Sequence, residues 1–561
     1  MRNRDNHKRW GLWALLSSCL LCVQAQEWQW LQTAGGKDAD VPRQIVVDNT
    51  GSSYVVGAFN SSNCFFGNIP LTNTLQAGYP TWDGFLAKYD TAGGVQWAVK
   101  FGGTNDDRAA GIAVDADHNC HVTGWFNSTN FFIGGVTLTN YAPNGNSCLF
   151  VAKFDSSAHL LWAHSPGAGN DSRGSRIVVD STGNIYVAGS FRGANSFGSS
   201  NLVAAGYGNI ALLKYDPSGN LLWIRQAGGN TGPDSPGGLA LDSANNVYLL
   251  ANIRSTNAAF GSLVFSVAGT NTCQNMVVAK YDPAGNVLWG KKYGGTSIDG
   301  GAGIAIGPGT NCYLTGSFCS TNLAFGSTTL HSSGDLVSAD IFVAVLDYFG
   351  NPFSAWAVHG DETHASTDIA VDPVGNCYVS GFFQGTNLVF DSGWLSSVTL
   401  TNSETHYLNA ADAFTAKFDA RGNTIHVFQA AGLADQRAFS VAVDGSATPF
   451  VTGWTMGTNV EFGNFAATNA YLDVFVAKLD PCLPVLQIVD GNLTAPGDAA
   501  AVTLSWPSLQ TGSAVGHVEC STNLLNWIPA STFQSVIGGG QYYQVILKTG
   551  AAVYYRLRLS D

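Results

Sequence analysis

Short apolar runs that end in an acidic residue recur along the chain. Each run is apolar at consecutive positions rather than alternate ones, which is typical of a strand buried on both faces. A fixed spacing of this kind indicates an internal repeat, with the run as its innermost strand. There are seven copies, 62 to 72 residues apart: Ile45–Asp48, Ile112–Asp115, Ile177–Asp180, Leu239–Asp242, Ile304–Gly307, Ile369–Asp372 and Val441–Asp444.

Three further elements follow each run. A second strand has the pattern of Tyr54–Gly57, a third has the pattern of Phe85–Asp90, and a fourth carries an aromatic anchor. Six anchors follow their runs, namely Trp97, Trp162, Trp223, Trp289, Trp356 and Phe428, whereas the seventh, Trp30, precedes the first run. The first strand therefore completes the last repeat. We predict an all-β fold, a seven-bladed β-propeller over residues 26–483 closed by an N-terminal strand, with aromatic packing between blades.

Residues 484–561 leave the repeat register after Pro481-Cys482-Leu483-Pro484. They contain five or six strand-like runs, including Ala501–Trp506 and Val553–Leu559. We predict a small C-terminal β-sandwich. Attachment or sorting is one role for it, and a packing cap for the propeller is the other.

The N-terminus has the organisation of an export signal over residues 1–25. A basic segment precedes an apolar stretch, and Val23-Gln24-Ala25 is a small-residue cleavage site. A lipoprotein signal is the alternative, because Leu16–Cys19 matches the lipobox pattern. No later segment is apolar for eighteen residues, so we expect no transmembrane segment and a secreted, cell-surface or outer-envelope location.

Composition excludes several classes of protein and partner. Only 12% of residues are charged, 12% are aromatic and 66 are Gly, which fits strands and tight turns rather than disorder or a coiled coil. The formal net charge is -13. Removing the signal lowers it further, because residues 1–25 hold four basic residues and one acid. Such a chain is not expected to bind nucleic acid or anionic lipid.

Cysteines recur in repeat register. Cys120, Cys312 and Cys377 occupy equivalent positions in different repeats, too far apart to pair, so we interpret them and Cys64 as small buried apolar residues. A disulfide from Cys148, or between Cys482 and Cys520, stays open. No cysteine spacing resembles a zinc site.

Two histidine clusters are candidate sites. In His118–His121, His121 replaces the Tyr of other repeats, which favours core packing. His359–His364 includes Asp361 and Glu362 and lies in a connecting loop, where a transition-metal site is the alternative to ordinary packing.

Acidic residues eight or nine positions before the last residue of each apolar run form the main candidate site. We expect them near one mouth of the central channel, where they bind cations or a polar ligand, or else cap their own turns. His364 occupies this offset in the sixth repeat, and the long connectors Cys64–Trp82 and Phe390–Ala411 should lie on the same face. The candidate binding residues are Asp40, Asp107, Arg108, Asp171, Arg173, Asp234, Asp299, Asp361, Asp435 and Arg437.

The repeat motifs resemble the bacterial seven-bladed propeller repeats known as SBBP repeats. The matching segments are Asp107-Arg108, Ile112–Asp115 and Phe150–Asp155, and the resemblance covers residues 26 to about 483. Gly307, Ala251 and Phe428 depart from the pattern. The Gly-His and Trp-Asp markers of WD repeats are absent. The resemblance implies the fold and an exported or cell-surface setting, and it supplies no catalytic residues.

The C-terminal part is similar to the fibronectin-like sandwiches that end many exported bacterial proteins. The matching segments are Ser505–Pro507, Ser521–Leu524 and Tyr554–Leu557. The resemblance implies a role for this module in attachment or sorting.

From these observations we expect a monomeric, non-enzymatic binding scaffold that recognises a protein or carbohydrate partner through the loops of one propeller face. We expect no cofactor, with Ca²⁺ as the one ion considered. A polysaccharide lyase or hydrolase that uses acids such as Asp107 and Asp299 is one alternative, because function depends on the site rather than the fold. A structural component of the cell envelope is another.

Overall fold

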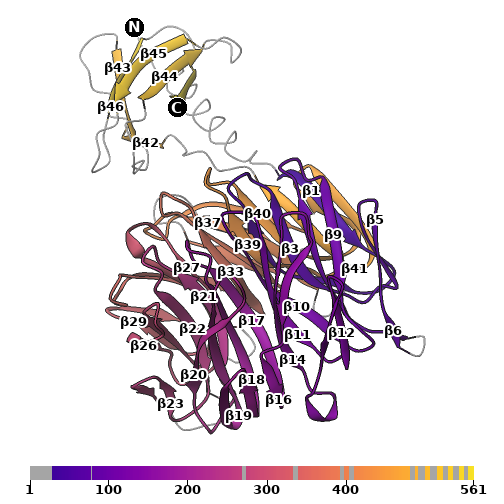
Figure 1. The fold of residues 1–561 in the computed structure, drawn as a ribbon. Coiled ribbons are helices and arrows are strands. Elements are labelled where there is room, and N and C mark those ends of the chain that lie inside the picture. Colours follow the sequence, from indigo (N-terminus) through magenta and orange to yellow (C-terminus); the bar gives the residue numbers. More distant parts are fainter. Residues whose placement is uncertain are drawn as a thin grey trace, which may run out of the picture. The chain divides into compact units, whose positions relative to one another are not determined.

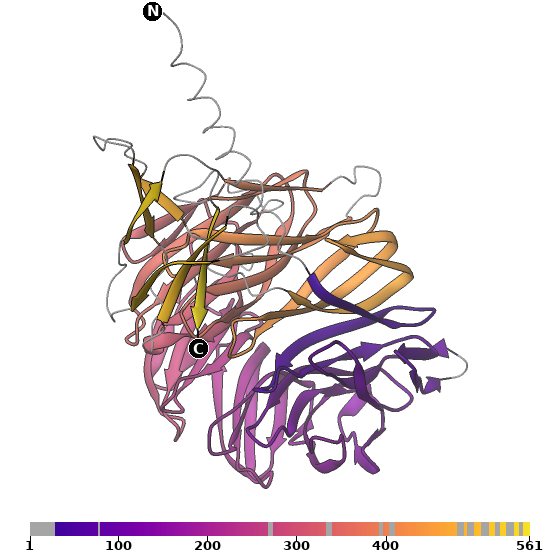
Figure 2. The ribbon, with the colours of Figure 1, turned by 90° about the horizontal axis from the view of Figure 1, so that it is seen from above.

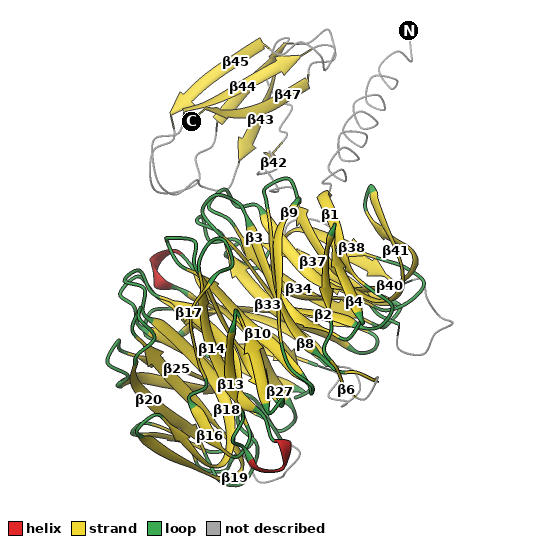
Figure 3. Cartoon of the chain, turned by 45° about the vertical axis from the view of Figure 1, so that its right-hand side comes forward, coloured by secondary structure: helices red, strands yellow, loops and turns green. Residues whose placement is uncertain are grey.

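The computed structural model describes residues 28–76, 79–267, 273–332, 339–391, 397–402 and 410–479, together with the strands of a C-terminal stretch. The predicted export signal lies outside the described residues. The chain divides into two compact units, one of them Glu27–Pro481. The described part is almost entirely strand, and its helical pieces are the short turns η2 (Pro143–Gly145) and η3 (Pro308–Thr310) (Figures 1 and 3). The prediction of an all-β fold is confirmed.

The larger unit repeats one antiparallel arrangement, in which four strands pair in the order first, second, third, fourth. The first strand of each sheet carries an apolar run seen in the sequence. These first strands are β2 (Asp40–Val47), β10 (Asp107–Val114), β17 (Ser172–Val179), β21 (Ser235–Leu241), β27 (Asp299–Ile306), β33 (His364–Val371) and β39 (Gln436–Val443).

The remaining strands of each sheet follow in chain order. The second strands are β3 (Ser53–Phe59), β11 (Cys120–Phe126), β18 (Ile185–Phe197), β22 (Val247–Ile253), β28 (Cys312–Phe318), β34 (Cys377–Phe383) and β40 (Pro449–Phe462). The third strands are β8 (Asp83–Tyr89), β14 (Cys148–Phe154), β19 (Ser200–Tyr215), β25 (Asn275–Tyr281), β31 (Asp340–Leu346), β37 (Asp412–Phe418) and β41 (Phe465–Leu479). The fourth strands are β9 (Val95–Phe101), β15 (Leu160–His164), β20 (Leu221–Gly228), β26 (Val287–Tyr293), β32 (Pro352–Gly360), β38 (Thr424–Ala430) and β1 (Trp28–Gly35).

The first strands lie beside one another in succession, from β2 through β10, β17, β21, β27 and β33 to β39, and β39 also contacts β2. The N-terminal strand β1 pairs with β41, with Trp30 opposite Lys478, so the indigo and orange strands lie side by side in Figure 2. A radial succession of four-stranded sheets is the architecture of a β-propeller.

The first strands are less buried than the sequence predicts. Only part of β2 is buried, because Val46 and Val47 are partly exposed, whereas every residue of β3 is buried. The expectation that the apolar runs are covered on both faces is therefore wrong for their ends. The first strand of each sheet lines the central channel, and the second and third strands lie in the middle of the sheet, where they pack against neighbouring sheets.

Aromatic anchors join each sheet to the turn of the next one. The indole nitrogen of Trp30 donates to the carbonyl oxygen of Thr91 at 3.1 Å, and its ring packs against Gly93. Gly93 has a φ of 87°, in the left-handed region that favours glycine. A side chain at Gly93 would meet the ring at 2.8 Å. Equivalent bonds are made by Trp97, Trp162, Trp223 and Trp289.

Two of the predicted anchors are out of register with the others. In the sheet of β1, Trp30 lies opposite Lys478 of the third strand. In β32 the position of Trp30 is occupied by Ser354, and Trp356 comes two positions later. Trp356 still packs on Gly422 of the next turn. Phe428 is shifted in the same way and packs edge-on against Trp28, with ring centroids 6.1 Å apart.

Short hairpins occupy the connectors between second and third strands. The hairpin β4 (Asn63–Phe66) and β5 (Ile69–Thr72) extends the sheet of β1, so it joins the N-terminal strand to the next blade. Other hairpins are β12 (Asn130–Ile133) with β13 (Val136–Thr139), β23 (Ala258–Phe260) with β24 (Leu263–Phe265), β29 (Asn322–Phe325) with β30 (Thr328–His331), and β35 (Asn387–Phe390) with β36 (Val398–Thr401). Smaller pieces are β6 (Leu75–Gln76), β7 (Tyr79–Pro80) and β16 (Gly167–Gly169).

Cys64, Cys120, Cys312 and Cys377 are buried and form no disulfide among the described residues, which confirms their interpretation as small buried apolar residues. Cys148 is also free. The proposed pairing of Cys482 with Cys520 lies outside the described side chains.

The C-terminal stretch forms two three-stranded sheets, with the orders β42-β43-β46 and β45-β44-β47. Their strands are β42 (Gln487–Asp490), β43 (Ala499–Ser505), β44 (Val515–Ser521), β45 (Ile528–Gln534), β46 (Tyr543–Lys548) and β47 (Tyr554–Ser560).

Candidate binding surface

Four of the candidate acids are buried at the start of a first strand or directly before it. Asp107 accepts hydrogen bonds from the backbone of Gly103 at 2.6 Å and of Asn127 at 3.0 Å, and from the backbone and hydroxyl of Ser128 at 3.1 and 2.6 Å. The carboxylate thus ties the Gly-Gly loop to the connector. Asp40 and Asp299 likewise accept bonds from the backbone and from a serine hydroxyl. Asp234 accepts the backbone bonds, while the hydroxyl of Ser255 donates to the carbonyl oxygen of Gly232.

The geometry of these four acids is that of turn caps. Their exposed fractions are between 0 and 2%, so they offer no surface to an incoming ligand. Asp107 and Asp299, on which the polysaccharide-cleaving alternative rests, belong to this buried group.

Two other candidate acids, Asp171 and Asp435, lie one residue earlier in the strand register. Ser172 and Gln436 occupy the position of Asp107, because they pair with Phe191 and Thr455 just as Asp107 pairs with Phe126. Asp171 and Asp435 correspond instead to Asp106. Asp106 is exposed, and Asp171 and Asp435 are partly buried. The candidate acids therefore include some at an inward-facing position and some at an outward-facing position.

Burial and neighbouring acids raise the pKa of several of these carboxyls. Burial raises the pKa of Asp107 to about 7, and the negative charge of Asp83 raises it further, whereas the hydrogen bonds from Ser128 lower it. Burial likewise raises the pKa of Asp40 to about 6, and burial together with Asp40 raises that of Asp473 to about 7. Asp83 begins β8 and Asp473 lies within β41, each the third strand of the preceding blade, so acids face each other across two blade junctions.

Arginines stack on aromatic rings beside the outward acids. The guanidinium of Arg108 lies 4.3 Å from the ring centroid of Trp82, and that of Arg173 lies 5.5 Å from Trp125. In both cases the ring belongs to the preceding blade. Stacks of this kind contribute roughly 0.5–1 kcal/mol when exposed.

Arg437 makes the third such stack. It lies 4.3 Å from Phe382 and 5.7 Å from Trp454, and its Nε donates to Asp435 at 3.0 Å. The indole nitrogen of Trp454 donates to the other oxygen of Asp435 at 3.1 Å. Arg173 pairs with Asp171 at 3.3 Å in the same manner.

We call this surface the Arg–aromatic rim. Its residues come from blades that are neighbours around the propeller, those of β39, β2, β10 and β17, together with Phe382 of the blade before them. The arginines of the rim were predicted from the sequence, but its aromatic rings were not. The available signal was an aromatic residue directly after the glycine of the second strand, as in Gly124-Trp125, Gly381-Phe382 and Gly453-Trp454. The rim consists of Trp82, Asp106, Arg108, Trp125, Asp171, Arg173, Phe382, Asp435, Arg437 and Trp454.

The histidine clusters are engaged in ordinary packing. His121 is buried and its Nε2 lies 3.1 Å from Asp115, in the place where the hydroxyl of Tyr54 donates to Asp48. His359 and His364 both lie within 3.4 Å of Asp340. Burial opposes the ionisation of Asp340, but the two histidines lower its pKa to about 2. Within the described residues no cluster of three or more potential ligands could hold a metal ion.

The last candidate, Asp361, is exposed and caps a loop. Its carboxylate accepts from the backbone of Asn387 at 3.1 Å and from the backbone and hydroxyl of Thr386. Burial opposes ionisation of Asp361, but these bonds lower its pKa.

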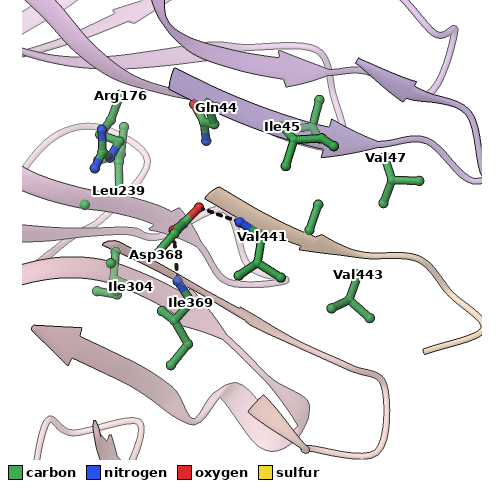
Figure 4. A pocket seen from close by; sticks show the side chains of 14 residues that line it. Gln44, Ile45, Val47, Arg176, Leu239, Ile304, Asp368, Ile369, Val441 and Val443 are labelled. Carbon is green, nitrogen blue, oxygen red and sulfur yellow. Dashed lines mark hydrogen bonds between the residues drawn. The ribbon is translucent and has the colours of Figure 1, made fainter. Parts of the chain in front are cut away.

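The first strands enclose a cavity of about 240 Å³ in the central channel (Figure 4). Each strand carries a β-bulge at the same level, for example between Pro42 and Gln44 and between Gly174 and Arg176. A bulge re-aims the side chains that follow it. Gln44, Arg176 and Asp368 line the cavity among apolar residues.

The sheets and their repeat define a β-propeller repeat protein. The chain is similar to an uncharacterized WD repeat-containing protein of Acanthamoeba polyphaga mimivirus, with 23% identity over 444 residues, 68% of this chain and 32% of the relative. The chain thus spans about a third of the length of that curated relative. No protein-family model matches the chain. Among the described residues no helix is long and apolar enough to span a membrane.

Proposed function

We propose that this protein is a non-enzymatic interaction scaffold that binds a protein partner through the Arg–aromatic rim. The observation that carries the proposal is the clustering of partly exposed Trp and Arg side chains, held in place by Asp171 and Asp435, on neighbouring blades. Trp and Arg dominate the energetic centres of protein interfaces. Stacking and ion pairing also fix these long side chains before binding, which reduces the entropy lost on association.

The similarity to a WD repeat-containing protein supports an interaction scaffold in general. A carbohydrate partner is the second ligand class, because flat aromatic rings beside carboxylates also suit sugars. Probing an array of proteins and glycans separates the two ligand classes.

The finer organisation is part of the same proposal. We infer seven blades closed by β1, because the first strands succeed one another from β2 to β39 and β1 completes the sheet of β39, β40 and β41. Membership of the SBBP repeats, export through residues 1–25 to the cell surface, and a fibronectin-like module over residues 484–561 rest on the sequence patterns alone. A role as a structural component of the envelope is compatible with the same scaffold.

The test is an array of surface proteins and glycans probed with the chain from residue 26 onward. Binding to a protein should weaken at least about 30-fold in Arg173→Ala or Trp125→Ala, which corresponds to roughly 2 kcal/mol. Arg421→Ala is the matched control, because Arg421 is exposed in the turn between β37 and β38, at the other end of the strands from the rim. Binding that all three variants preserve would place the interface elsewhere.

A further inference from the structure

Side chains join neighbouring first strands at the level of the β-bulges in the channel. Oε1 of Gln44 accepts a hydrogen bond from the backbone amide of Ile112 at 2.9 Å, and the hydroxyl of Ser440 accepts one from the amide of Ile45 at 3.3 Å. In each case the acceptor directly follows the bulge of one blade, and the donor lies on the next blade. The residue after each bulge therefore decides whether an amide of the next blade has an acceptor.

The amides of Leu239 and Ile304, two residues that line the cavity, occupy the register of Ile112 in their own blades. The residue after the bulge of the blade before Leu239 is Arg176, whose guanidinium group only donates. In the blade before Ile304 it is Gly238, which has no side chain. Within the described structure no side chain accepts from either amide, and β21 and β27 each end their sheet, paired with β22 and β28. Because buried backbone amides are almost always paired, these two donors are available to a ligand.

Two opposite charges flank the same part of β27. Nη2 of Arg176 reaches past the blade of β21 and donates to the carbonyl oxygen of Ala302 at 3.3 Å. From the other side, Oδ1 of Asp368 lies 3.1 Å from the point that a Cβ on Gly303 would occupy. Burial lowers the pKa of Arg176, and the negative charge of Asp368 opposes this shift, although no direct ion pair joins the two groups in the part of the chain that the structure describes. A cation, an anion and the amide of Ile304 therefore lie around one short stretch of β27 (Figure 4).

Asp368 can accept a further hydrogen bond. Its Oδ1 accepts from the amide of Ile369 at 2.9 Å, and its Oδ2 accepts from the hydroxyl of Ser440 at 2.5 Å and from the amide of Val441 at 3.4 Å. A carboxylate offers about four lone-pair positions, so Oδ1 retains one. The remaining wall of the cavity is largely aliphatic, with Ile45, Leu239, Ile304, Ile369, Val441 and Val443. The cavity thus combines a polar end with an apolar wall.

We propose that this cavity binds a small zwitterion with an apolar body, namely an α-amino acid with an aliphatic side chain. Its carboxylate accepts from the guanidinium of Arg176 and from the amides of Leu239 and Ile304, and its ammonium group donates to Oδ1 of Asp368. The aliphatic side chain packs against the apolar wall. This site is distinct from the Arg–aromatic rim.

The charge and size of the cavity both favour such a ligand. Arg176 and Asp368 are the charged residues among the described ones that line it, and their charges cancel, which suits a zwitterion better than a simple anion or cation. Two short contacts with the ligand replace a longer attraction between the two side chains, and walls of low dielectric strengthen both contacts. The volume of about 240 Å³ lies below the range of roughly 300–1,000 Å³ typical of sites for drug-sized ligands.

Calorimetric titration of the full chain with leucine and, separately, with valine tests the proposal. We expect saturable binding of at least one of the two amino acids and a higher melting temperature in its presence. Two analogues of leucine separate the charges: 4-methylpentanoate lacks the ammonium group, and 3-methylbutylamine lacks the carboxylate. Each analogue should bind at least about tenfold more weakly than leucine, because each leaves one charge of the site unpaired. Equal affinity for leucine and both analogues would contradict the proposal.

Arg176→Gln and Asp368→Asn should each weaken binding of the amino acid at least about tenfold. Arg421→Gln and Asp117→Asn are the matched controls, because they remove the same charges from exposed turns and should leave the affinity unchanged. If a cavity variant does not fold, the analogue series on the unaltered chain decides. Absence of saturable binding by both amino acids overturns the proposal. Rim variants such as Arg173→Ala should not affect this titration, so the two proposals fail independently.

Discussion

At the scale of the residue, the buried aspartates are structural elements that resemble ligand sites in the sequence. Asp107 satisfies four donors from two loops, three of them backbone amides. Removing an acceptor from buried donors costs about 1–3 kcal/mol for the donors left unsatisfied. Asp107 therefore holds the connector that contains Asn127 and Ser128 against the loop that contains Gly103.

Asp107→Ala should lower the free energy of unfolding by about 3 kcal/mol, because its donors lose their acceptor inside the protein. Equilibrium denaturation in urea measures this loss. The neighbouring Asp106→Ala is the control, since Asp106 is exposed and accepts one bond from Trp82, and its effect should stay within about 0.5 kcal/mol. Equal effects of the two substitutions would contradict the capping role.

The indole nitrogens of the anchors provide a second residue-scale comparison. Trp30 donates to Thr91, whereas the indole nitrogen of Trp356 is buried without a hydrogen-bond partner among the described residues. Trp30→Phe should therefore cost about 1 kcal/mol more than Trp356→Phe, because only the first loses a hydrogen bond. Thermal unfolding of the two variants measures the difference, and the reverse order would argue against the shifted register of Trp356.

At the scale of the element, the sequence predicts strands better than side-chain direction. Apolar runs and turn residues are local signals, so the four-strand repeat and the place of Trp30 could be predicted. The outward position of Asp171 corresponds to its offset of nine residues from Asp180, where Asp107 lies eight residues from Asp115, and one residue reverses the face of a strand. The meeting of Gln44, Arg176 and Asp368 in the channel could not be predicted, because a bulge in each first strand interrupts the period of two on which such counting depends.

Loss of the N-terminal strand should affect the whole propeller. Deleting residues 26–34 removes Trp30 from Gly93 and exposes the edge of β41, which is otherwise paired with β1. We expect a large drop in melting temperature and a tendency to associate, measured by calorimetry and light scattering. A truncated protein that melts as the full one does would show that β1 does not hold the ring together.

At the scale of the whole molecule, paired acids at blade junctions link stability to pH. The pKa values of Asp107 and Asp473 are raised to about 7, above the ordinary value of 3.8, so the folded state holds protons that the unfolded state has released. Their stabilising effect is fully present below the unfolded pKa and is lost as the pH rises through about 7. The lowered pKa of His121 and His426 acts in the opposite direction, because the unfolded histidines, with a pKa of 6.5, still release protons as the pH rises from 6.5 to 8.

The contribution of Asp107 to the free energy of unfolding should therefore fall by about 0.8 kcal/mol as the pH rises from about 6.5 to about 8, and that of Asp473 should fall as well, against the opposing effect of the two histidines. Denaturation across this range measures the slope. Asp473→Asn keeps the shape of the side chain but removes its proton equilibrium, so the slope should become shallower in that variant. It should also change the titration of Asp40, whose charge contributes to the raised pKa of Asp473 across the junction between β41 and β2. A slope that Asp473→Asn leaves unchanged would mean that this junction is hydrated and that its acids titrate independently.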